Sequence, residues 1–219
     1  MKQNIVIIDY GMGNLRSVEN KFRVQNCQAQ ISEDPEIIAK ADKLVLPGVG
    51  HFANGMKNLK EKGILDVLQQ KVILDKTPIL GICLGMQLFT NGSEEGDVEG
   101  LGWIEASTKK FEFDFKESFL KVPHMGWNSL RIKKEHDLVD NVWDDDQFYF
   151  VHSYYVECNK EEDILTETQY GQVFTSSIQK ENIIGVQFHP EKSHDVGAIM
   201  ITNFVEKCSE SFRKISEAA

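Results

Sequence analysis

The sequence predicts an α/β fold, with a mostly parallel central sheet that is flanked by helices and extended by antiparallel strands. In the first half of the chain, strand and helix signals alternate, and the strands are continuous aliphatic runs. Such runs are typical of parallel strands that helices cover on both faces. In the second half, short strand-like runs are separated by polar turns, which favours antiparallel pairing. We expect residues 1–219 to form a single domain.

The elements of the first half follow in a regular order. Residues 5–9 form an aliphatic run that ends at the glycine-rich turn of residues 11–13, and a helix is expected from about residue 14 to residue 24. Glycine and proline end several of the later elements, as they commonly do. Further strands are expected at residues 29–31, 43–46 and 77–82, and further helices at residues 52–60, 64–74 and 84–90.

The second half of the chain changes character after about residue 100. Its clearest strand-like runs are residues 130–132, 148–151 and 172–174. We expect these runs to extend the same sheet by antiparallel pairing. Near the end, residues 183–188 are an aliphatic run typical of another core strand, and a final helix is expected from about residue 196 to residue 212.

The charge of the chain argues against several classes of function. There are 24 basic and 34 acidic residues, which gives a net charge of −10 at neutral pH. With no basic stripe, neither nucleic acid nor an anionic membrane surface is an expected partner. The first apolar run is too short for the core of a signal peptide or for a membrane span. We therefore expect a cytoplasmic protein.

No motif in the sequence predicts a metal or a cofactor. The turn at residues 11–13 is only faintly similar to a dinucleotide-binding fingerprint, because Arg16 stands where the third glycine should be. The acidic run at residues 144–146 lacks matched ligands nearby and is interpreted as a solvated loop. The four cysteines form no C-x-x-C pair, which argues against a zinc or redox site; they are Cys27, Cys83, Cys158 and Cys208.

One cysteine lies in a sequence context that favours catalysis. Cys83 is the centre of a G-x-C-x-G motif, between Gly81 and Gly85, at the junction of an aliphatic strand and a helix. This is the thiol counterpart of the nucleophile elbow of hydrolases, in which larger flanking side chains would clash. The start of the helix favours the thiolate, and the N–H of Leu84 becomes available to an oxyanion. The alternative is a buried structural cysteine between packing glycines.

A possible base lies far along the chain, directly after the run at residues 183–188. His189 and Glu191 are separated by Pro190, and in an extended segment residues two apart share one face. The carboxylate would then orient the imidazole, as in a catalytic triad. A lone histidine here would more often be an ordinary surface residue, but the acidic partner and the cysteine elbow together favour Cys83, His189 and Glu191 as the catalytic residues.

A third segment, residues 47–50, closes an earlier strand with the sequence Pro-Gly-Val-Gly. Glycines allow close approach of the backbone and positive φ angles. The peptide between Val49 and Gly50 could therefore turn its N–H toward a tetrahedral intermediate. A simple turn that ends the strand is the equally plausible alternative.

Together these three segments resemble the class I, or triad, glutamine amidotransferases, which have a flavodoxin-like α/β fold. Within that family the resemblance is closest to the HisH glutaminase subunits of imidazole glycerol phosphate synthase. It covers about residues 5–204 and rests further on residues 9–15, 121–128 and 149–155, which include the specific string Pro-His-Met-Gly-Trp-Asn.

The resemblance implies a function and a partner. Such a subunit hydrolyses L-glutamine to glutamate and ammonia, and Gly48 and Gln87 would help to bind the glutamine. The ammonia would pass through the (β/α)₈ barrel of a separate HisF cyclase subunit in a heterodimer. There it would convert the nucleotide PRFAR to imidazole glycerol phosphate and AICAR in histidine biosynthesis. The residues expected to face that partner are Asn14, Pro123, Met125, Trp127, Tyr149 and Lys192.

Two alternatives remain open at this point. After Lys192 the chain continues Ser193-His194, and with residues 174–176 this is similar to HisH-like paralogues of surface-polysaccharide gene clusters. Those deliver ammonia to a HisF-like partner for amidino-sugar synthesis, with the same glutaminase chemistry. A stand-alone cysteine hydrolase with the same elbow is the second alternative, and it would need no partner.

Overall fold

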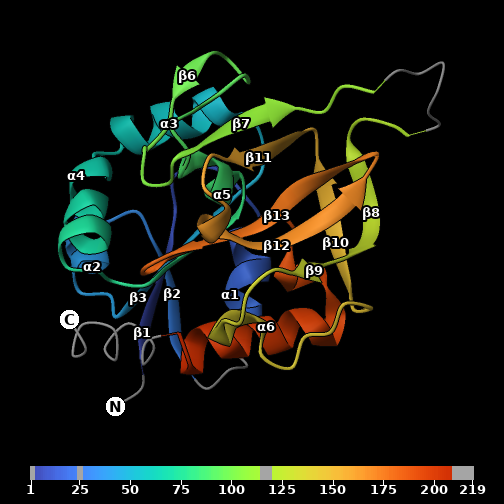
Figure 1. Ribbon diagram of the computed structural model, residues 1–219. Coiled ribbons are helices and arrows are strands. Elements are labelled where there is room, and N and C mark those ends of the chain that lie inside the picture. The colour runs from blue at the N-terminus through green and yellow to red at the C-terminus, as the bar shows by residue number, and fades with distance from the viewer. Residues whose placement is uncertain (1–2, 24–26, 114–119, 209–219) are drawn as a thin grey trace.

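Parallel strands form the first part of a large sheet in this computed structural model, which describes residues 3–23, 27–113 and 120–208. The order β2-β1-β3-β4-β14 is parallel throughout, and its first three strands are labelled in Figure 1. Parallel strands end at one edge of a sheet, and ligands bind in the crevice outside that edge. The bounds are β1 Asn4–Ile8, β2 Gln28–Ser32, β3 Lys43–Gly48, β4 Ile79–Cys83 and β14 Ile183–Val186.

The sequence alternates its aliphatic side chains between two apolar layers. On β1, Ile5 and Ile7 pack in one cluster with Phe22 and Phe204, whereas Val6 and Ile8 face the other. This alternation buries both faces of the strand. Helices α1 (Leu15–Arg23) and α6 (His194–Glu206) cover the first face; α2 (Pro35–Ala39), α3 (Phe52–Glu61), α4 (Leu65–Leu68) and α5 (Leu84–Leu88) cover the second.

Mainly antiparallel strands continue the sheet beyond β14, as the sequence predicts. β13 pairs with β14, and β11 and β7 follow it toward the far edge, where β5 runs parallel to β7. β12 pairs with β13 and with the short strand β9. The bounds are β13 Gln172–Lys180, β11 Tyr154–Cys158, β7 Ala106–Lys110, β5 Gly92–Ser93, β6 Val98–Glu99, β12 Ile164–Tyr170 and β9 Arg131–Ile132.

One strand-like run does not join this sheet, and here the expectation from sequence is wrong. β10 (Gln147–His152) pairs with β8 (His124–Ser129) in a separate two-stranded sheet. The other edge of β10 is occupied by the segment after β14, because the Tyr149 carbonyl accepts the His189 N–H at 2.9 Å and the Tyr149 N–H donates to Ser193 Oγ at 3.0 Å. These bonds leave no edge of β10 for the main sheet.

Several helices differ in extent from the expectation. The helix expected at residues 64–74 consists of α4 followed by a π-helical turn, Gln69–Leu74. The helix after Cys83 is shorter than expected and ends at Leu88, and the last helix begins two residues early and ends at Glu206. The expected ends at residues 24 and 212 lie outside the described residues. No helix within the described segments combines the length and the apolar character that a membrane crossing would require.

Candidate active site

Cys83 lies in a strained turn between β4 and α5. Its backbone has φ 54° and ψ −107°, a conformation that residues with a side chain seldom adopt. The flanking glycines make this turn possible. A Cβ on Gly85 would stand 1.7 Å from the Leu46 carbonyl oxygen, and one on Gly81 would stand 2.5 Å from the Phe89 ring. The motif is therefore a steric requirement of the strand-to-helix junction.

His189 and Glu191 form a buried pair directly after β14. His189 Nδ1 lies 2.8 Å from Glu191 Oε1, and both side chains are almost wholly buried. The backbone differs from the expected extended segment, because Pro190–Lys192 is a 3₁₀ turn. The Lys192 N–H donates to the His189 carbonyl and the Ser193 N–H to the Pro190 carbonyl, so the turn itself brings the carboxylate beside the ring.

The charge state of His189 is set by opposing effects. Burial lowers the pKa of its imidazole, but interactions with the Cys83 sulfur and with Glu191 outweigh burial and raise the pKa to about 9. Nε2 of His189 is buried and makes no hydrogen bond within the described part of the chain. This ring nitrogen is therefore available to accept a proton, and Cys83 is one of the two acidic groups that raise the pKa of the ring.

The sulfur of Cys83 has two polar neighbours that were not predicted. Gln187 Nε2 donates to it at 3.5 Å, and the Val151 carbonyl lies 3.9 Å away. Gln187 could have been found by the argument that identified His189, since the two are two residues apart at the end of a core strand. Val151 could not, because only the tertiary position of β10 brings its carbonyl to the sulfur.

The glycine-rich loop after β3 lies beside the elbow. Gly48 is paired in register with Cys83, and a Cβ on Gly48 would stand 2.1 Å from Tyr10 Oη and 2.9 Å from Leu84 Cβ. Gly50 has φ 117°, which favours glycine, and Val49 is exposed. The structure thus brings the predicted loop to the start of α5, where the Leu84 N–H is located.

Gln87, predicted to help bind glutamine, is buried in the second turn after Cys83. Its Nε2 donates to the Tyr154 carbonyl at 3.1 Å and to Gln187 Oε1 at 3.0 Å. The amide nitrogen of Gln87 is therefore committed within the protein, beside the cysteine rather than free in the crevice. Its part in substrate binding stays a prediction.

Comparisons with known proteins identify the family of the chain. Residues 6–208 match the family described as glutamine amidotransferase class-I. The chain belongs to the class I glutamine amidotransferases. A Methanococcus maripaludis protein named imidazole glycerol phosphate synthase subunit HisH 2 is 53% identical to this amidotransferase over 203 residues, which cover 93% of this chain and 99% of the relative. A Campylobacter jejuni protein named subunit HisH 1 is 49% identical over 202 residues, covering 92% and 98%.

Solved structures support the fold of the amidotransferase. A crystal structure described as that of a glutamine amidotransferase has a TM-score of 0.71 at 17% identity, covering 93% of this chain and 98% of that one. The glutaminase domain of Trypanosoma brucei CTPS, solved with bound acivicin, has a TM-score of 0.66 at 16% identity, covering 95% and 94%. At such identities the likeness establishes the fold alone.

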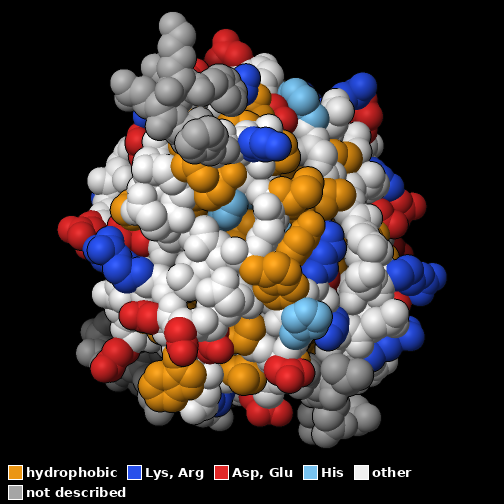
Figure 2. Space-filling view, turned by 90° about the vertical axis from the view of Figure 1, so that its right-hand side faces the viewer, with side chains coloured by type: hydrophobic (Ala, Val, Ile, Leu, Met, Phe, Trp, Pro, Cys, Tyr) orange, Lys and Arg blue, Asp and Glu red, His pale blue; other side chains and the backbone are white. Residues whose placement is uncertain are grey.

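The residues predicted to face a partner lie mostly around the β8–β10 pair. Met125 and Trp127 on β8 are exposed, and the Trp127 ring packs edge-on against Tyr149 of β10 at 5.8 Å. Lys192 Nζ lies 5.6 Å from the centre of the Tyr149 ring. β8 lies at the right of Figure 1. Figure 2 shows the molecule from that side, and apolar side chains are gathered across the middle of this face. Pro123, just before β8, and Asn14, just before α1, are both exposed.

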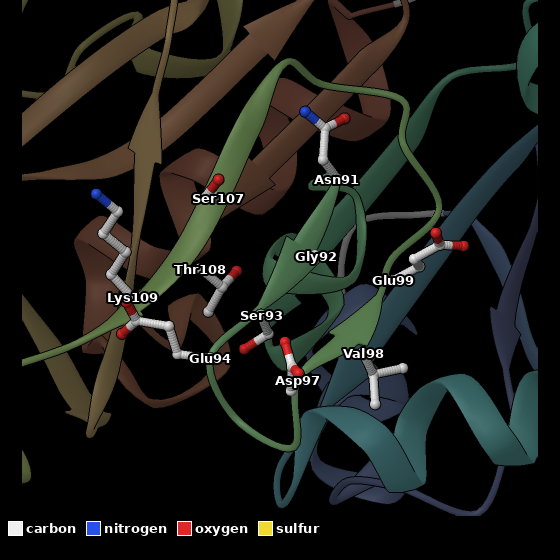
Figure 3. Close-up of a pocket in the computed structure, with 10 residues that line it drawn as sticks. All are labelled: Asn91, Gly92, Ser93, Glu94, Asp97, Val98, Glu99, Ser107, Thr108 and Lys109. Carbon is white, nitrogen blue, oxygen red and sulfur yellow. The ribbon is translucent and has the colours of Figure 1, made fainter.

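A separate pocket of about 420 Å³ lies away from these residues, among β5, β6 and β7. Figure 3 shows Glu94, Asp97 and Glu99 around it, together with Lys109. None of the residues predicted for catalysis or for glutamine binding lines this pocket. Within the described part of the chain, no cluster of three or more His, Cys, Asp or Glu side chains is arranged to hold a metal ion.

Proposed function

We propose that this amidotransferase hydrolyses L-glutamine with Cys83 as nucleophile, His189 as base and Glu191 as the group that orients His189. The observation that carries the proposal is the buried His189–Glu191 pair at 2.8 Å, whose ring interacts with the sulfur of a cysteine held at an elbow. A thiol, a histidine that raises its reactivity and a carboxylate bonded to that histidine form a nucleophile, a base and an orienting group.

In the proposed reaction the Cys83 thiol passes its proton to His189 Nε2, and the sulfur attacks the side-chain amide carbon of glutamine. The resulting oxyanion is stabilised by the Leu84 N–H and by an N–H of the Val49–Gly50 peptide once that peptide faces it. His189 then protonates the leaving nitrogen, ammonia departs, and a γ-glutamyl thioester remains on Cys83. Water, deprotonated by His189, attacks the thioester and releases glutamate.

We further propose that the ammonia is delivered to a HisF-type (β/α)₈ cyclase subunit in a heterodimer. The names of the relatives, which are 53% and 49% identical over nearly their whole length, support this assignment. The cyclase would use the ammonia to convert PRFAR to imidazole glycerol phosphate and AICAR, in cytoplasmic histidine biosynthesis. Residues 1–219 would act as one glutamine amidotransferase domain.

The proposed docking face consists of Asn14, Pro123, Met125, Trp127, Tyr149 and Lys192. Its apolar character supports a protein partner, because Met125 and Trp127 are 62% and 45% exposed. β10 connects this face to the site: the Tyr149 carbonyl accepts the His189 N–H, and the Val151 carbonyl contacts the Cys83 sulfur. A partner that shifts β8 and β10 would therefore act directly on both reacting groups.

A second candidate function keeps the same glutamine hydrolysis but delivers the ammonia to a different partner. His194, which belongs to the Lys-Ser-His continuation noted in the sequence, stacks on Trp127 at 4.8 Å and an interplanar angle of 6°. The residue that makes the chain similar to the sugar-pathway paralogues thus lies against the proposed docking face, where it would affect the choice of partner. This favours testing a HisF-like subunit of amidino-sugar synthesis beside the histidine-pathway cyclase.

The test is glutamate release by the purified chain, alone and with each candidate partner and its acceptor. We expect weak activity alone and strong stimulation by one partner, because an oxyanion donor that faces the substrate is worth about 10² to 10³ in rate. Trp127→Ala and Lys192→Ala should lower the stimulation more than they raise the KM for glutamine. Full activity of the chain alone would contradict the partner-dependent reading and favour a stand-alone cysteine hydrolase.

A further inference from the structure

A continuous series of hydrogen bonds joins the exposed strand β8 to the sulfur of Cys83. His124 Nδ1 of β8 lies 3.0 Å from His152 Nε2 of β10, and His152 Nδ1 lies 2.7 Å from the Tyr154 carbonyl oxygen. Gln87 Nε2 donates to the same carbonyl and to Gln187 Oε1. Gln187 Nε2 donates to the sulfur of Cys83 at 3.5 Å. All four side chains of the series are at least 95% buried.

Every bond of the series has only one possible direction. A carbonyl oxygen only accepts, so His152 must carry its proton on Nδ1. Burial lowers the pKa of His152 to about 3 and that of His124 to about 4, so both rings are neutral at pH 7. The bare His152 Nε2 then accepts from His124 Nδ1–H. The bare His124 Nε2 accepts from Asn128 Nδ2 at 3.3 Å.

The same argument determines the orientation of the amide groups of Gln87 and Gln187. Gln87 must present its amide NH₂ group toward the Tyr154 carbonyl, and it therefore donates to Gln187 with the same group. Gln187 accepts through Oε1, which leaves its NH₂ group for the Cys83 sulfur. An inverted glutamine at either place would set two acceptors or two donors against each other in a buried site, which is costly.

We propose that Gln187 is a catalytic contact that stabilises and aims the Cys83 sulfur, and that Gln87, His152 and His124 are positioning residues that act through it. The inference rests on the proposed role of Cys83 as nucleophile. It links the docking face to the site, because His124 lies between Pro123 and Met125 on the exposed strand. A displacement of β8 is transmitted to the reacting atom through this series of buried donors and acceptors.

The first test measures the direction of the series and needs no substitution. Long-range ¹⁵N–¹H NMR of the full chain at pH 7 reports which ring nitrogen of each histidine carries the proton. We expect the Nδ1–H form for both His124 and His152. The Nε2–H form, or a charged ring, at either position would overturn the proposal, since the series could not then run from β8 to the sulfur.

The second test measures the effect on the sulfur by alkylation of Cys83 with iodoacetamide at pH 7, followed by peptide mass spectrometry. Gln187→Met keeps the length of the side chain but removes the donor, and we expect alkylation about tenfold slower. Cys158 and Cys208 are internal controls, because burial raises their pKa values to about 12. A wild-type rate in Gln187→Met, with an unchanged melting temperature, would overturn the proposal.

The third test uses a matched pair at the far end. His124→Asn keeps an N–H donor close to the place of Nδ1, whereas His124→Phe keeps the ring and removes the donor. We expect alkylation of Cys83 to slow about threefold in His124→Phe and to stay within about twofold of wild type in His124→Asn. Equal rates in the two variants would mean that His124 acts only through packing, against the proposal.

The alkylation rate also separates this inference from the proposed function. If the chain proves inactive on glutamine while Gln187→Met and His124→Phe slow alkylation, the proposed function fails and the positioning series stands. If Cys83→Ser abolishes glutaminase activity while Gln187→Met is alkylated at the wild-type rate, the proposed function stands and the series fails.

Discussion

The parallel strands and the β8–β10 pair place the residues of the site by different physical means. β3, β4 and β14 are aliphatic runs buried on both faces, and the elbow and the His189 turn follow directly from their ends. β10 is positioned by hydrogen bonds to residues about 40 positions away: the Tyr149 backbone bonds to the His189 N–H and to the Ser193 hydroxyl. The first arrangement can be predicted from neighbouring residues in the sequence, whereas the second depends on tertiary contacts.

The two regions also divide the reacting groups from the groups that adjust them. Cys83, His189 and Glu191 come from the parallel strands, whereas Val151, His152 and the exposed Trp127 belong to the two-stranded sheet. We therefore expect substitutions in the first region to remove activity and substitutions in the second to scale it. Substitutions in both regions test that division, beginning with the largest expected effect.

Replacing the nucleophile should abolish glutamine hydrolysis. In Cys83→Ser the backbone of the elbow can remain, but a hydroxyl does not ionise at neutral pH and is a far weaker nucleophile. Glutamate release should fall to the level of a blank reaction. Cys158→Ser is the matched control, because burial holds the pKa of that thiol near 12 and it should not react. Retained hydrolysis in Cys83→Ser would remove the basis of the proposed mechanism.

The base and its orienting group should differ in effect. His189→Ala removes the proton carrier and should cost about 10² to 10⁴ in kcat. Glu191→Gln keeps a group that can accept from His189 Nδ1 and loses only the charge, so a smaller loss in kcat is expected. Steady-state kinetics of both variants measure the difference. A Glu191→Gln enzyme that is slower than His189→Ala would contradict the assigned roles.

Substitution of one glycine in each region compares the two regions by the free energy of unfolding rather than by the reaction rate. An alanine Cβ at Gly85 of the elbow would lie 1.7 Å from the Leu46 carbonyl oxygen, so the backbone would have to move. Gly85→Ala should therefore lower the free energy of unfolding by about 3 kcal/mol or more. Gly126 of β8 has φ 141° but no neighbour within 4 Å of a built Cβ. Gly126→Ala should therefore cost only about 1 kcal/mol.

Chemical denaturation of the two variants measures this difference. Similar losses at both glycines would mean that the elbow can relax as readily as the edge strand. The packing of the two regions predicts the opposite, since the elbow is held between β3 and α5 and the edge strand borders solvent.

Much of the fold could be predicted because its signals are local. The aliphatic runs and the glycines of the elbow each express a periodic or steric requirement of neighbouring residues. His189 and Glu191 lie side by side as expected, but through a 3₁₀ turn rather than through the extended segment that the spacing predicted. The place of residues 148–151 was predicted wrongly, because pairing with β8 and contact with Ser193 are tertiary facts. Gln187 was within reach of the periodicity argument, but His152 and Val151 were not, since nothing near them in sequence identifies the sulfur as their neighbour.

The last effect is a difference in sign between the two regions as pH changes. The folded-state pKa of His189 is raised to about 9, above the unfolded value near 6.5, so the folded state binds more protons between these values. This contribution to stability is present below pH 6.5 and is lost as pH rises toward 9. His124 and His152 have folded-state pKa values of about 4 and 3, so their contribution is present above pH 6.5 and is lost as pH falls toward 4.

Between pH 4 and pH 8 stability should therefore decline on both sides of about pH 6.5, by at most about 1.4 kcal/mol per pH unit for each histidine. Above pH 8 the effect of Lys43, whose pKa burial lowers to about 8, has the opposite sign. Urea denaturation across pH 4 to 9 measures both limbs in wild type and in two variants. His189→Gln should reduce only the loss of stability on the alkaline side. His124→Asn should reduce only the loss of stability on the acid side. The acid loss that remains is due to His152 and to His136, whose pKa burial also lowers to about 4. If His189→Gln altered the acid limb instead, the two regions would be titrating as one coupled unit, and the division between reacting and adjusting groups would not hold.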